Sequence, residues 1–228
     1  MRGPSVLLDA GAGEGKLARV LAPHRDRVVA VDPSAEMIRG GRRLPGGAAG
    51  NLQWIESRLE EAALVGPYGL ATAAASFHWM DADLVLRRLA ELLAPGACLA
   101  LLDGDTPVGT PWADDEREVM LETLRRAGDA IVGRWSSIEE RLAAPAFEHP
   151  RFEPLGLEVT APAPFTQSVG DYLRCQHSRQ SFSEDHLAPE VSEYFDSALR
   201  EVLEPHAVDG RLSMGVPVRI EWGRPRPA

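Results

Sequence analysis

The stretch LLDAGAGEGKL, residues 7–17, has the residue types and spacing of a ligand-binding turn. Asp9 follows a short apolar run, and glycines at 11, 13 and 15 precede a helical pattern, so the backbone can bend sharply there and approach a ligand closely. A dinucleotide fingerprint needs its third glycine where this chain has Lys16, and a P-loop needs a longer spacing. Because the charge of Asp9 opposes a pyrophosphate, the turn predicts a nucleotide-like ligand that carries positive charge.

Two later positions could complete such a site. Asp32 ends an apolar run about twenty residues after the glycines, where a carboxylate can accept hydrogen bonds from both hydroxyls of a ribose. Its alternative role is a helix cap, but Ser34 can fill that role. His78 and Trp79 follow another apolar run, and an isolated pair of this kind more often packs than reacts. At a strand end, we expect His78 to orient a substrate or act as a base, because histidine ordinarily titrates near neutral pH.

Short apolar runs alternate with helical patterns in the first half of the chain. Strands are predicted over 6–9, 27–32, 52–56, 70–75 and 98–103, each too short and continuous for an amphipathic helix. Four helical patterns lie between them. The alternation predicts an α/β fold with a parallel sheet covered by helices on both faces. Right-handed crossovers would then bring Asp9, Asp32 and His78 to the edge formed by the carboxyl ends of the strands.

The second half of the chain is less regular, with five prolines between 145 and 164. Helices are predicted over 114–127, 138–143 and 191–203, and strands over 158–160, 165–168 and 214–222. With 228 residues, we expect a single domain over 1–228. Its halves would be 1–105, which binds the nucleotide-like ligand, and 106–228, which lies on the substrate side and adds a helical cap.

Composition limits the partners. The chain has 24 basic and 34 acidic residues, a net charge of −10, which opposes attraction to phosphate backbones and anionic membranes. It has no apolar run of membrane-spanning length and no signal-peptide pattern. We therefore expect a cytoplasmic protein with neither a nucleic-acid nor a membrane partner. Cys98 and Cys175 lack disulfide or metal spacing, the six histidines lack metal-site spacing, and no metal is expected.

The order of these motifs resembles that of class I S-adenosylmethionine-dependent methyltransferases, whose first motif is similar to DAGAGEG. TAAASFHWMD is similar to the segment after strand four in a small-molecule subgroup related to trans-aconitate methyltransferases. The resemblance implies a Rossmann-like, mostly parallel seven-stranded sheet, with S-adenosylmethionine as cofactor and S-adenosylhomocysteine as product. It implies that Asp9 helps hold the cofactor ammonium. The cofactor residues it implies are Asp9, Ala10, Gly11, Gly13, Gly15, Asp32, Pro33, Met37, Ser57, Arg58, Leu59, Ala75, Ser76 and Phe77.

The resemblance also implies a small-molecule acceptor. His78, as catalytic residue, and Trp79 would face the transferred methyl group. SVGDYLRCQHSRQSFSED is similar to a substrate-facing helix of the subgroup, so the candidates for binding an acidic substrate are Tyr172, Arg174, His177 and Arg179. A solvated polar helix is the alternative interpretation of this segment.

Two departures from the family pattern leave alternatives open. Ser57 stands where the family usually has an aspartate for the adenine amino group, and the sequence begins five residues before Val6, where the subgroup usually has one or two covering helices. We expect residues 105–150, or a second subunit of a homodimer, to close the site. The leading function is methyl transfer to a carboxylate, hydroxyl or amine. One alternative is a catalytically silent cofactor-binding or partner protein. The other is an NAD(P)-dependent oxidoreductase, but that function leaves the glycine spacing unexplained.

Overall fold

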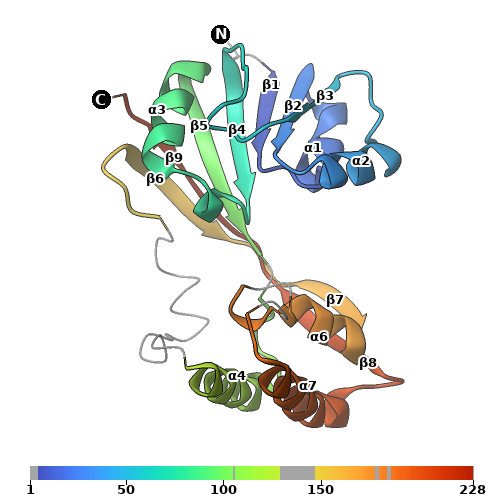
Figure 1. Ribbon diagram of the computed structural model, residues 1–228. Helices are drawn as coiled ribbons and strands as arrows, with labels where there is room; N and C mark the ends of the chain where they lie inside the picture. The colour runs from blue at the N-terminus through green and yellow to red at the C-terminus, as the bar shows by residue number, and fades with distance from the viewer. Residues whose placement is uncertain (1–4, 105, 129–146, 178–179, 184–185, 228) are drawn as a thin grey trace. The chain divides into compact units, whose positions relative to one another are not determined.

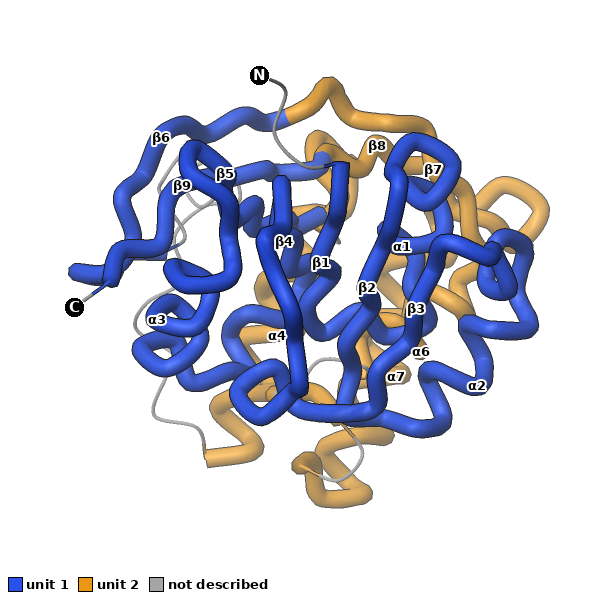
Figure 2. Tube along the Cα trace, turned by 90° about the horizontal axis from the view of Figure 1, so that it is seen from above, with its two compact units in different colours: residues 1–104, 145–159, 218–228 blue, residues 105–144, 160–217 orange. Residues whose placement is uncertain are grey.

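The computed structural model describes residues 5–104, 106–128, 147–177, 180–183 and 186–227. The chain forms two compact units, which Figure 2 colours separately. Unit 1 consists of residues 1–104, 145–159 and 218–228, and unit 2 of residues 105–144 and 160–217. The first boundary falls after residue 104, one residue before the expected division. Two later segments differ from that expectation, because 145–159 and 218–228 belong to unit 1, where they supply strands.

Unit 1 contains a seven-stranded sheet in the order β3-β2-β1-β4-β5-β9-β6 (Figure 1). Neighbouring strands from β3 to β5 are parallel, and β9 is antiparallel to both β5 and β6. This confirms the predicted mostly parallel, seven-stranded α/β sheet. The strands are β1 (Val6–Ala10), β2 (Arg27–Asp32), β3 (Leu52–Glu56), β4 (Tyr68–Ala74), β5 (Leu93–Asp103), β6 (Phe152–Val159) and β9 (Arg219–Pro225).

Helices cover both faces of this sheet, as its alternating pattern predicts. On one face, Ala18 of α1 (Lys16–Leu21) joins a buried cluster with Leu7 and Val28. On the other face, Val85 and Leu89 of α3 (Ala82–Leu92) join a larger cluster that also holds the neighbouring strand positions Leu8 and Val29. The third helix, α2 (Ala35–Arg43), follows β2, and a short 3₁₀ helix, η1 (Ala22–His24), follows α1.

Side-chain caps determine where two of these helices begin. Ser34 caps α2, with its hydroxyl accepting the Met37 N–H at 3.3 Å. Asp81 caps α3, with its carboxylate accepting the Leu84 N–H at 3.0 Å. Each cap satisfies a backbone donor that the helix itself leaves unpaired. Ser34 therefore fills the capping role that was the alternative for Asp32.

Within its described residues, unit 2 packs three helices around its own core. They are α4 (Ala113–Ala127), α6 (Val169–His177) and α7 (Pro189–Leu203), together with the antiparallel pair β7 (Ala163–Ser168) and β8 (Arg211–Val216) and the 3₁₀ helices η4 (Gln180–Phe182) and η5 (Glu204–His206). Phe195 and Leu199 of α7 are fully buried in this core beside Trp112 and Tyr172. The helical spacing of apolar residues in α7 thus gives it one buried face.

The predicted final strand over 214–222 is wrong. Its residues belong to two strands, because β8 pairs with β7 in unit 2 and β9 pairs with β5 and β6 in unit 1. Pro217 lies between them, and proline cannot donate a hydrogen bond to a sheet. The predicted helix over 138–143 lies outside the described residues. No helix within the described ranges is long and apolar enough to cross a membrane.

Candidate functional site

The glycine-rich turn after β1 is tied to the end of β2. Gly11 and Gly13 have φ of +62° and +56°, in the left-handed region that glycine adopts without strain. The Gly13 N–H donates to the Asp32 carboxylate at 2.7 Å, and the Ala12 N–H donates to the Val31 carbonyl at 3.0 Å. A carboxylate at the end of β2 therefore fixes the turn that follows β1.

The same turn packs closely against the loop that follows β4. The Ser76 hydroxyl donates to the Ala10 carbonyl at 2.8 Å. A Cβ at Gly11 would lie 2.5 Å from the Ser76 Cβ and 3.1 Å from the Met80 Cε. Glycine is therefore required at position 11 for steric as well as conformational reasons.

Gly15 meets a different neighbour. Its φ is +68°, and a Cβ there would lie 2.3 Å from the ring of Trp54 in β3. The Trp54 indole N–H donates to the Gly47 carbonyl at 2.9 Å, which fixes the ring. Gly15 thus allows α1 to start close against β3. The sequence had predicted that Gly15 contacts the ligand.

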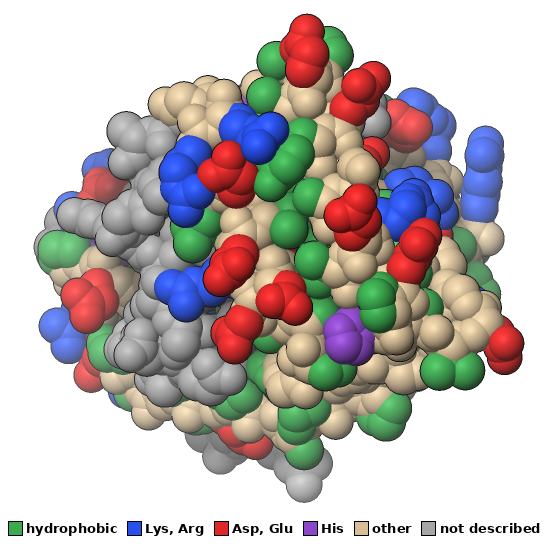
Figure 3. Space-filling model, turned by 90° about the horizontal axis from the view of Figure 1, so that it is seen from below, with side chains coloured by type: hydrophobic (Ala, Val, Ile, Leu, Met, Phe, Trp, Pro, Cys, Tyr) green, Lys and Arg blue, Asp and Glu red, His purple; other side chains and the backbone are tan. Residues whose placement is uncertain are grey.

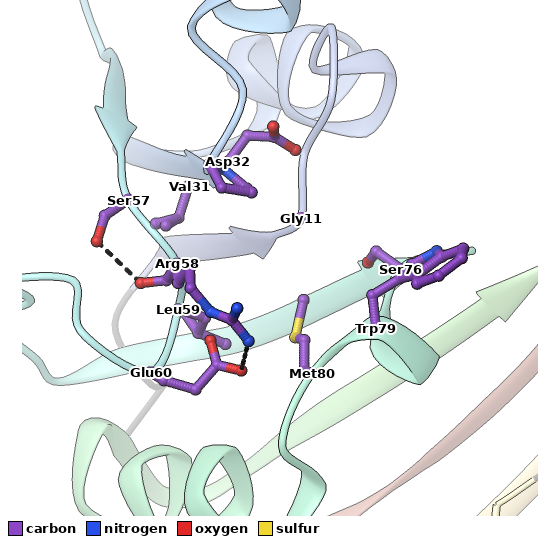
Figure 4. Close-up of a pocket in the computed structure, with 11 residues that line it drawn as sticks. Gly11, Val31, Asp32, Ser57, Arg58, Leu59, Glu60, Ser76, Trp79 and Met80 are labelled. Carbon is purple, nitrogen blue, oxygen red and sulfur yellow. Dashed lines mark hydrogen bonds and ion pairs between the residues drawn. The ribbon is translucent and has the colours of Figure 1, made fainter.

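A cavity of about 400 Å³ lies beside the turn, and Figure 4 shows its lining. Residues from the ends of β1 and β2 lie on one side, the segment after β3 lies beside them, and the loop after β4 completes the wall. This volume falls in the range of small-molecule and cofactor pockets. The lining residues are Gly11, Val31, Asp32, Pro33, Ser57, Arg58, Leu59, Glu60, Ser76, Trp79 and Met80.

The donor and acceptor set of this cavity fits a nucleoside. Each Asp32 oxygen accepts one backbone N–H, from Gly13 at 2.7 Å and from Ser34 at 2.8 Å. Because each carboxylate oxygen has a second lone pair, Asp32 can still accept two ribose hydroxyls. Val31 and Leu59 offer apolar surface for a base. The Ser57 hydroxyl donates to the Arg58 carbonyl at 2.9 Å, which leaves its lone pairs able to accept an amino group.

Glu60 joins two loops of the cavity and was missed by sequence analysis. Its carboxylate accepts the Asp81 N–H at 3.0 Å and pairs with Arg58 at 3.3 Å. Although burial raises the pKa of Glu60, these hydrogen bonds hold it below its ordinary value. Arg88 of α3 also donates to the Glu60 and Ala62 carbonyls. The segment after β3 is thus bound to the start of α3. A single acidic residue in the sequence does not indicate such a contact.

Asp9 is buried behind the turn and does not line the cavity. It is 2% exposed, and its carboxylate accepts the Thr72 hydroxyl at 2.7 Å and the Ala18 N–H at 3.2 Å. Burial raises the pKa of Asp9 to about 6, although these two hydrogen bonds oppose the rise. The expected contact with a ligand ammonium therefore does not fit this placement. Asp9 instead holds the start of α1 against β4.

This pKa predicts how stability depends on pH. The raised value means that folded Asp9 binds its proton more tightly than unfolded Asp9, so its contribution to the free energy of unfolding is largest below about pH 4 and falls by about 3 kcal/mol as the pH rises through 6. In Asp9→Asn, the amide can donate to Thr72 and accept from Ala18 without ionising. Urea unfolding from pH 4.5 to 7.5 should show the variant gaining stability relative to wild type as the pH rises. A constant difference over this range would contradict the assignment.

A second cavity, of about 280 Å³, adjoins the first. Ser76 and Met80 line both. His78 lies in the 3₁₀ turn η2 (Phe77–Trp79), which follows the end of β4. The centres of the His78 and Trp79 rings are 4.9 Å apart. The second cavity is lined by Ala73, Ala75, Ser76, Phe77, His78, Met80, Ala82, Leu101, Leu102, Asp103, Phe147 and Arg219, all in unit 1.

The sequence-predicted cofactor residues therefore divide between several places. Seven line the first cavity: Gly11, Asp32, Pro33, Ser57, Arg58, Leu59 and Ser76. Ala75 and Phe77 line the second cavity, whereas Met37 is 46% exposed on α2 and lines neither. Trp79, expected on the substrate side, lines the first cavity, and His78 lines the second. Val31 and Met80 were missed, although Val31 could have been found as the apolar residue before Asp32.

The predicted substrate residues of the second half have other partners in unit 2. Tyr172 is buried and donates to Glu116 at 2.7 Å, and Arg174 pairs with Asp171. The His177 ring nitrogens lie 2.7 Å from the Asp196 carboxylate and 2.6 Å from the Phe182 carbonyl. Arg179 lies outside the described residues. Tyr172 and His177 thus serve the packing of unit 2, a role that the polar segment did not indicate.

The strand order with an antiparallel β9, the glycine-rich turn after β1 and the carboxylate at the end of β2 define a class I S-adenosylmethionine-dependent methyltransferase fold. Residues 8–99 match the family model described as a methyltransferase domain. This part of the chain, less than half of its length, is accordingly similar to methyltransferase domains, a class whose cofactor is S-adenosylmethionine.

Similar proteins include characterised enzymes and solved structures. A trans-aconitate 2-methyltransferase from Azoarcus sp. is 33% identical over 100 residues, which cover 42% of this chain and 38% of that protein. A tRNA 5-carboxymethoxyuridine methyltransferase from Escherichia coli is 35% identical over 107 residues, covering 44% and 41%. The chain thus spans about two fifths of the length of each. A putative type II methyltransferase from Anaeromyxobacter dehalogenans shares the fold, with a TM-score of 0.64 and 21% identity over 98% of this chain and 91% of that one.

Proposed function

We propose that this protein transfers the methyl group of S-adenosylmethionine to a small-molecule acceptor. The observation that carries the proposal is the pair of adjoining cavities in unit 1. The first has hydrogen-bond donors and acceptors around Asp32 that suit a nucleoside. The second adjoins it, and Ser76 and Met80 line both. A cofactor in the first cavity and an acceptor in the second would thus lie within reach of each other.

In this proposal, the residues of the chain mainly bind and align. Asp32 accepts the ribose hydroxyls, Ser57 accepts the adenine amino group, and Val31 and Leu59 contact the base. When bound, the cofactor supplies a methyl group that is already activated on a sulfonium, so alignment and exclusion of water provide most of the catalysis. Ser76 and Met80, which line both cavities, form the boundary at which the two ligands would meet.

His78 is the proposed base for an acceptor that has a proton to lose. The imidazole of His78 would take the proton that an acceptor oxygen or nitrogen loses when it is methylated. A carboxylate acceptor needs no base, and His78 would then only orient it. The lining of the second cavity by His78 supports either role. An alanine variant that retains full turnover at saturating cofactor would contradict both.

A nucleic-acid acceptor is the second candidate, because one similar protein is a tRNA methyltransferase by name. The net charge of −10 disfavours it, since binding to a phosphate backbone relies on basic residues. On the face that Figure 3 shows, acidic side chains lie among the basic ones, and the described residues there form no continuous basic patch. Both observations favour the small acceptor.

Calorimetric titration with S-adenosylmethionine, S-adenosylhomocysteine and NADH tests the proposal. We expect micromolar binding of the first two and none of NADH, because the glycine spacing and Asp32 suit a single nucleoside. Transfer of labelled methyl to pools of small acids, alcohols and amines, with bulk tRNA alongside, then identifies the acceptor class. Binding of NADH alone would overturn the proposal in favour of an oxidoreductase. Binding without transfer to any pool would favour a catalytically silent protein, and transfer to tRNA alone would overturn the small acceptor.

A further inference from the structure

The second cavity contains a charged residue that the proposed mechanism does not use. Arg219 begins β9, and Asp103 ends β5, and the two are direct partners in the antiparallel register. Both line the cavity together with His78. Because side chains alternate between the faces of a strand, directly paired residues project from the same face. The acceptor side of the site therefore carries one cationic and one anionic group beside the imidazole.

The two charges differ in their exposure to water. Arg219 is 8% exposed, whereas Asp103 is exposed. Water screens the charge of an exposed carboxylate, but a buried charge acts through a medium of lower dielectric constant and interacts more strongly with a ligand. Among the residues that line the cavity, Arg219 is therefore the charged group that acts most strongly on a ligand; the buried carboxylate of Glu221, two residues further along β9, does not line it. Its guanidinium has five N–H donors, so it can bind a ligand carboxylate while it keeps other partners.

The remaining wall of the cavity is apolar and aromatic. The rings of Phe77 and Phe147 meet edge to face with their centres 4.9 Å apart. Leu101 of β5 also lines the cavity. Phe147 is held in turn by Phe152 at 5.3 Å. Such a wall favours a flat, apolar ligand body, because aromatic rings pack edge to face or offset against other rings.

We infer that the acceptor is a small, flat organic anion whose carboxylate binds Arg219 and whose body lies against Phe77 and Phe147. Arg219 is then the residue that selects a charged acceptor over a neutral one of the same shape. This inference rests on the proposed function, which it deepens by naming the acceptor class. It moves acid recognition from the second half of the chain, where sequence analysis expected it, to a strand of unit 1.

Benzoate and benzamide test this inference, because they share size and shape and differ in charge. Each is titrated calorimetrically into the full chain saturated with S-adenosylhomocysteine. Benzoate should bind saturably and at least roughly tenfold more tightly than benzamide, since hydrogen bonds to a carboxylate are charge-assisted. Arg219→Gln should abolish the preference. Arg224→Gln changes an exposed arginine of the same strand and should leave the preference intact.

Arg219→Lys keeps the test decisive if the glutamine variant does not fold. Lysine retains the charge but loses the bidentate geometry, so benzoate binding should weaken several-fold while benzamide binding stays the same. Equal binding of the two probes, binding of neither, or a preference that survives in a folded Arg219→Gln protein would overturn the inference. If S-adenosylhomocysteine itself fails to bind wild type, the proposed function fails instead. Titrating benzoate without cofactor then decides separately whether Arg219 binds a carboxylate.

Discussion

Replacing Gly11 with alanine is expected to reduce the affinity for S-adenosylmethionine by at least about a hundredfold, or about 2.7 kcal/mol. An alanine Cβ would lie 2.5 Å from the Cβ and 2.8 Å from the Oγ of Ser76, closer than such atoms approach in proteins, and the residue would have to adopt a φ of +62°. Either the turn or the loop after β4 must therefore move. Both line the cofactor cavity, so the cavity cannot keep its shape.

Two alanine variants separate the steric effect from the effect of conformation. Gly13→Ala shares the positive φ but meets no atom within 4 Å, so it should cost only about 1–2 kcal/mol in the free energy of unfolding. Gly50→Ala has neither constraint and should behave like wild type. Calorimetry and urea unfolding of the three variants provide the comparison. Wild-type cofactor affinity in a folded Gly11→Ala protein would rule out the proposed position of the cofactor.

The second large effect is expected from Asp32→Ala. The variant loses the acceptor of two ribose hydroxyls, and hydrogen bonds to a charged group contribute about 1.5–3 kcal/mol each, so affinity for S-adenosylmethionine should fall by at least about a hundredfold. It also leaves the Gly13 and Ser34 N–H groups without their acceptor. A loss of about 1–2 kcal/mol in the free energy of unfolding should accompany the loss of binding.

The Asp32 experiment has a matched control just before the same strand. Asp26→Ala removes an exposed carboxylate just before β2 and should change neither cofactor affinity nor unfolding. Asp32→Asn keeps the size of the side chain and one acceptor oxygen, so its affinity should lie between those of wild type and Asp32→Ala. A loss of stability without a loss of affinity would assign Asp32 to the turn alone.

The two cavities change how the second half of the chain is understood. The expected acceptor residues lay on a polar helix of that half, but both cavities are lined by unit 1 alone. Unit 2 has its own core, which includes Tyr172 and Phe195. The ring of His177 packs against Phe195. The later segments 145–159 and 218–228 matter for the site because they bring Phe147 and Arg219 to the second cavity.

The sequence by itself determined the strands of the first half and three of the four helices predicted between them, whereas residues 57–67, between β3 and β4, form no helix. β2 and β3 have the predicted boundaries. β2 is a buried parallel strand, a continuous apolar run that ends at Asp32, whereas β3 lies at the edge of the sheet, is only partly buried and ends at Glu56. Asp32 and Ser34 could be assigned for the same reason, since a strand end and a helix cap are local features. The glycines at 11 and 13 predicted a turn with positive φ, a conformation that glycine adopts without strain.

Only the tertiary structure decided which of these residues face a ligand. Asp9 and Gly15 lie in the same motif as Gly11, but both pack against residues that are distant in sequence. Asp9 accepts a hydrogen bond from Thr72, and Gly15 lies against the ring of Trp54. Arg219 lies at the second cavity because an antiparallel pairing sets it beside Asp103. These roles depend on contacts between residues far apart in the chain, and neither local periodicity nor spacing records which strand will be a neighbour.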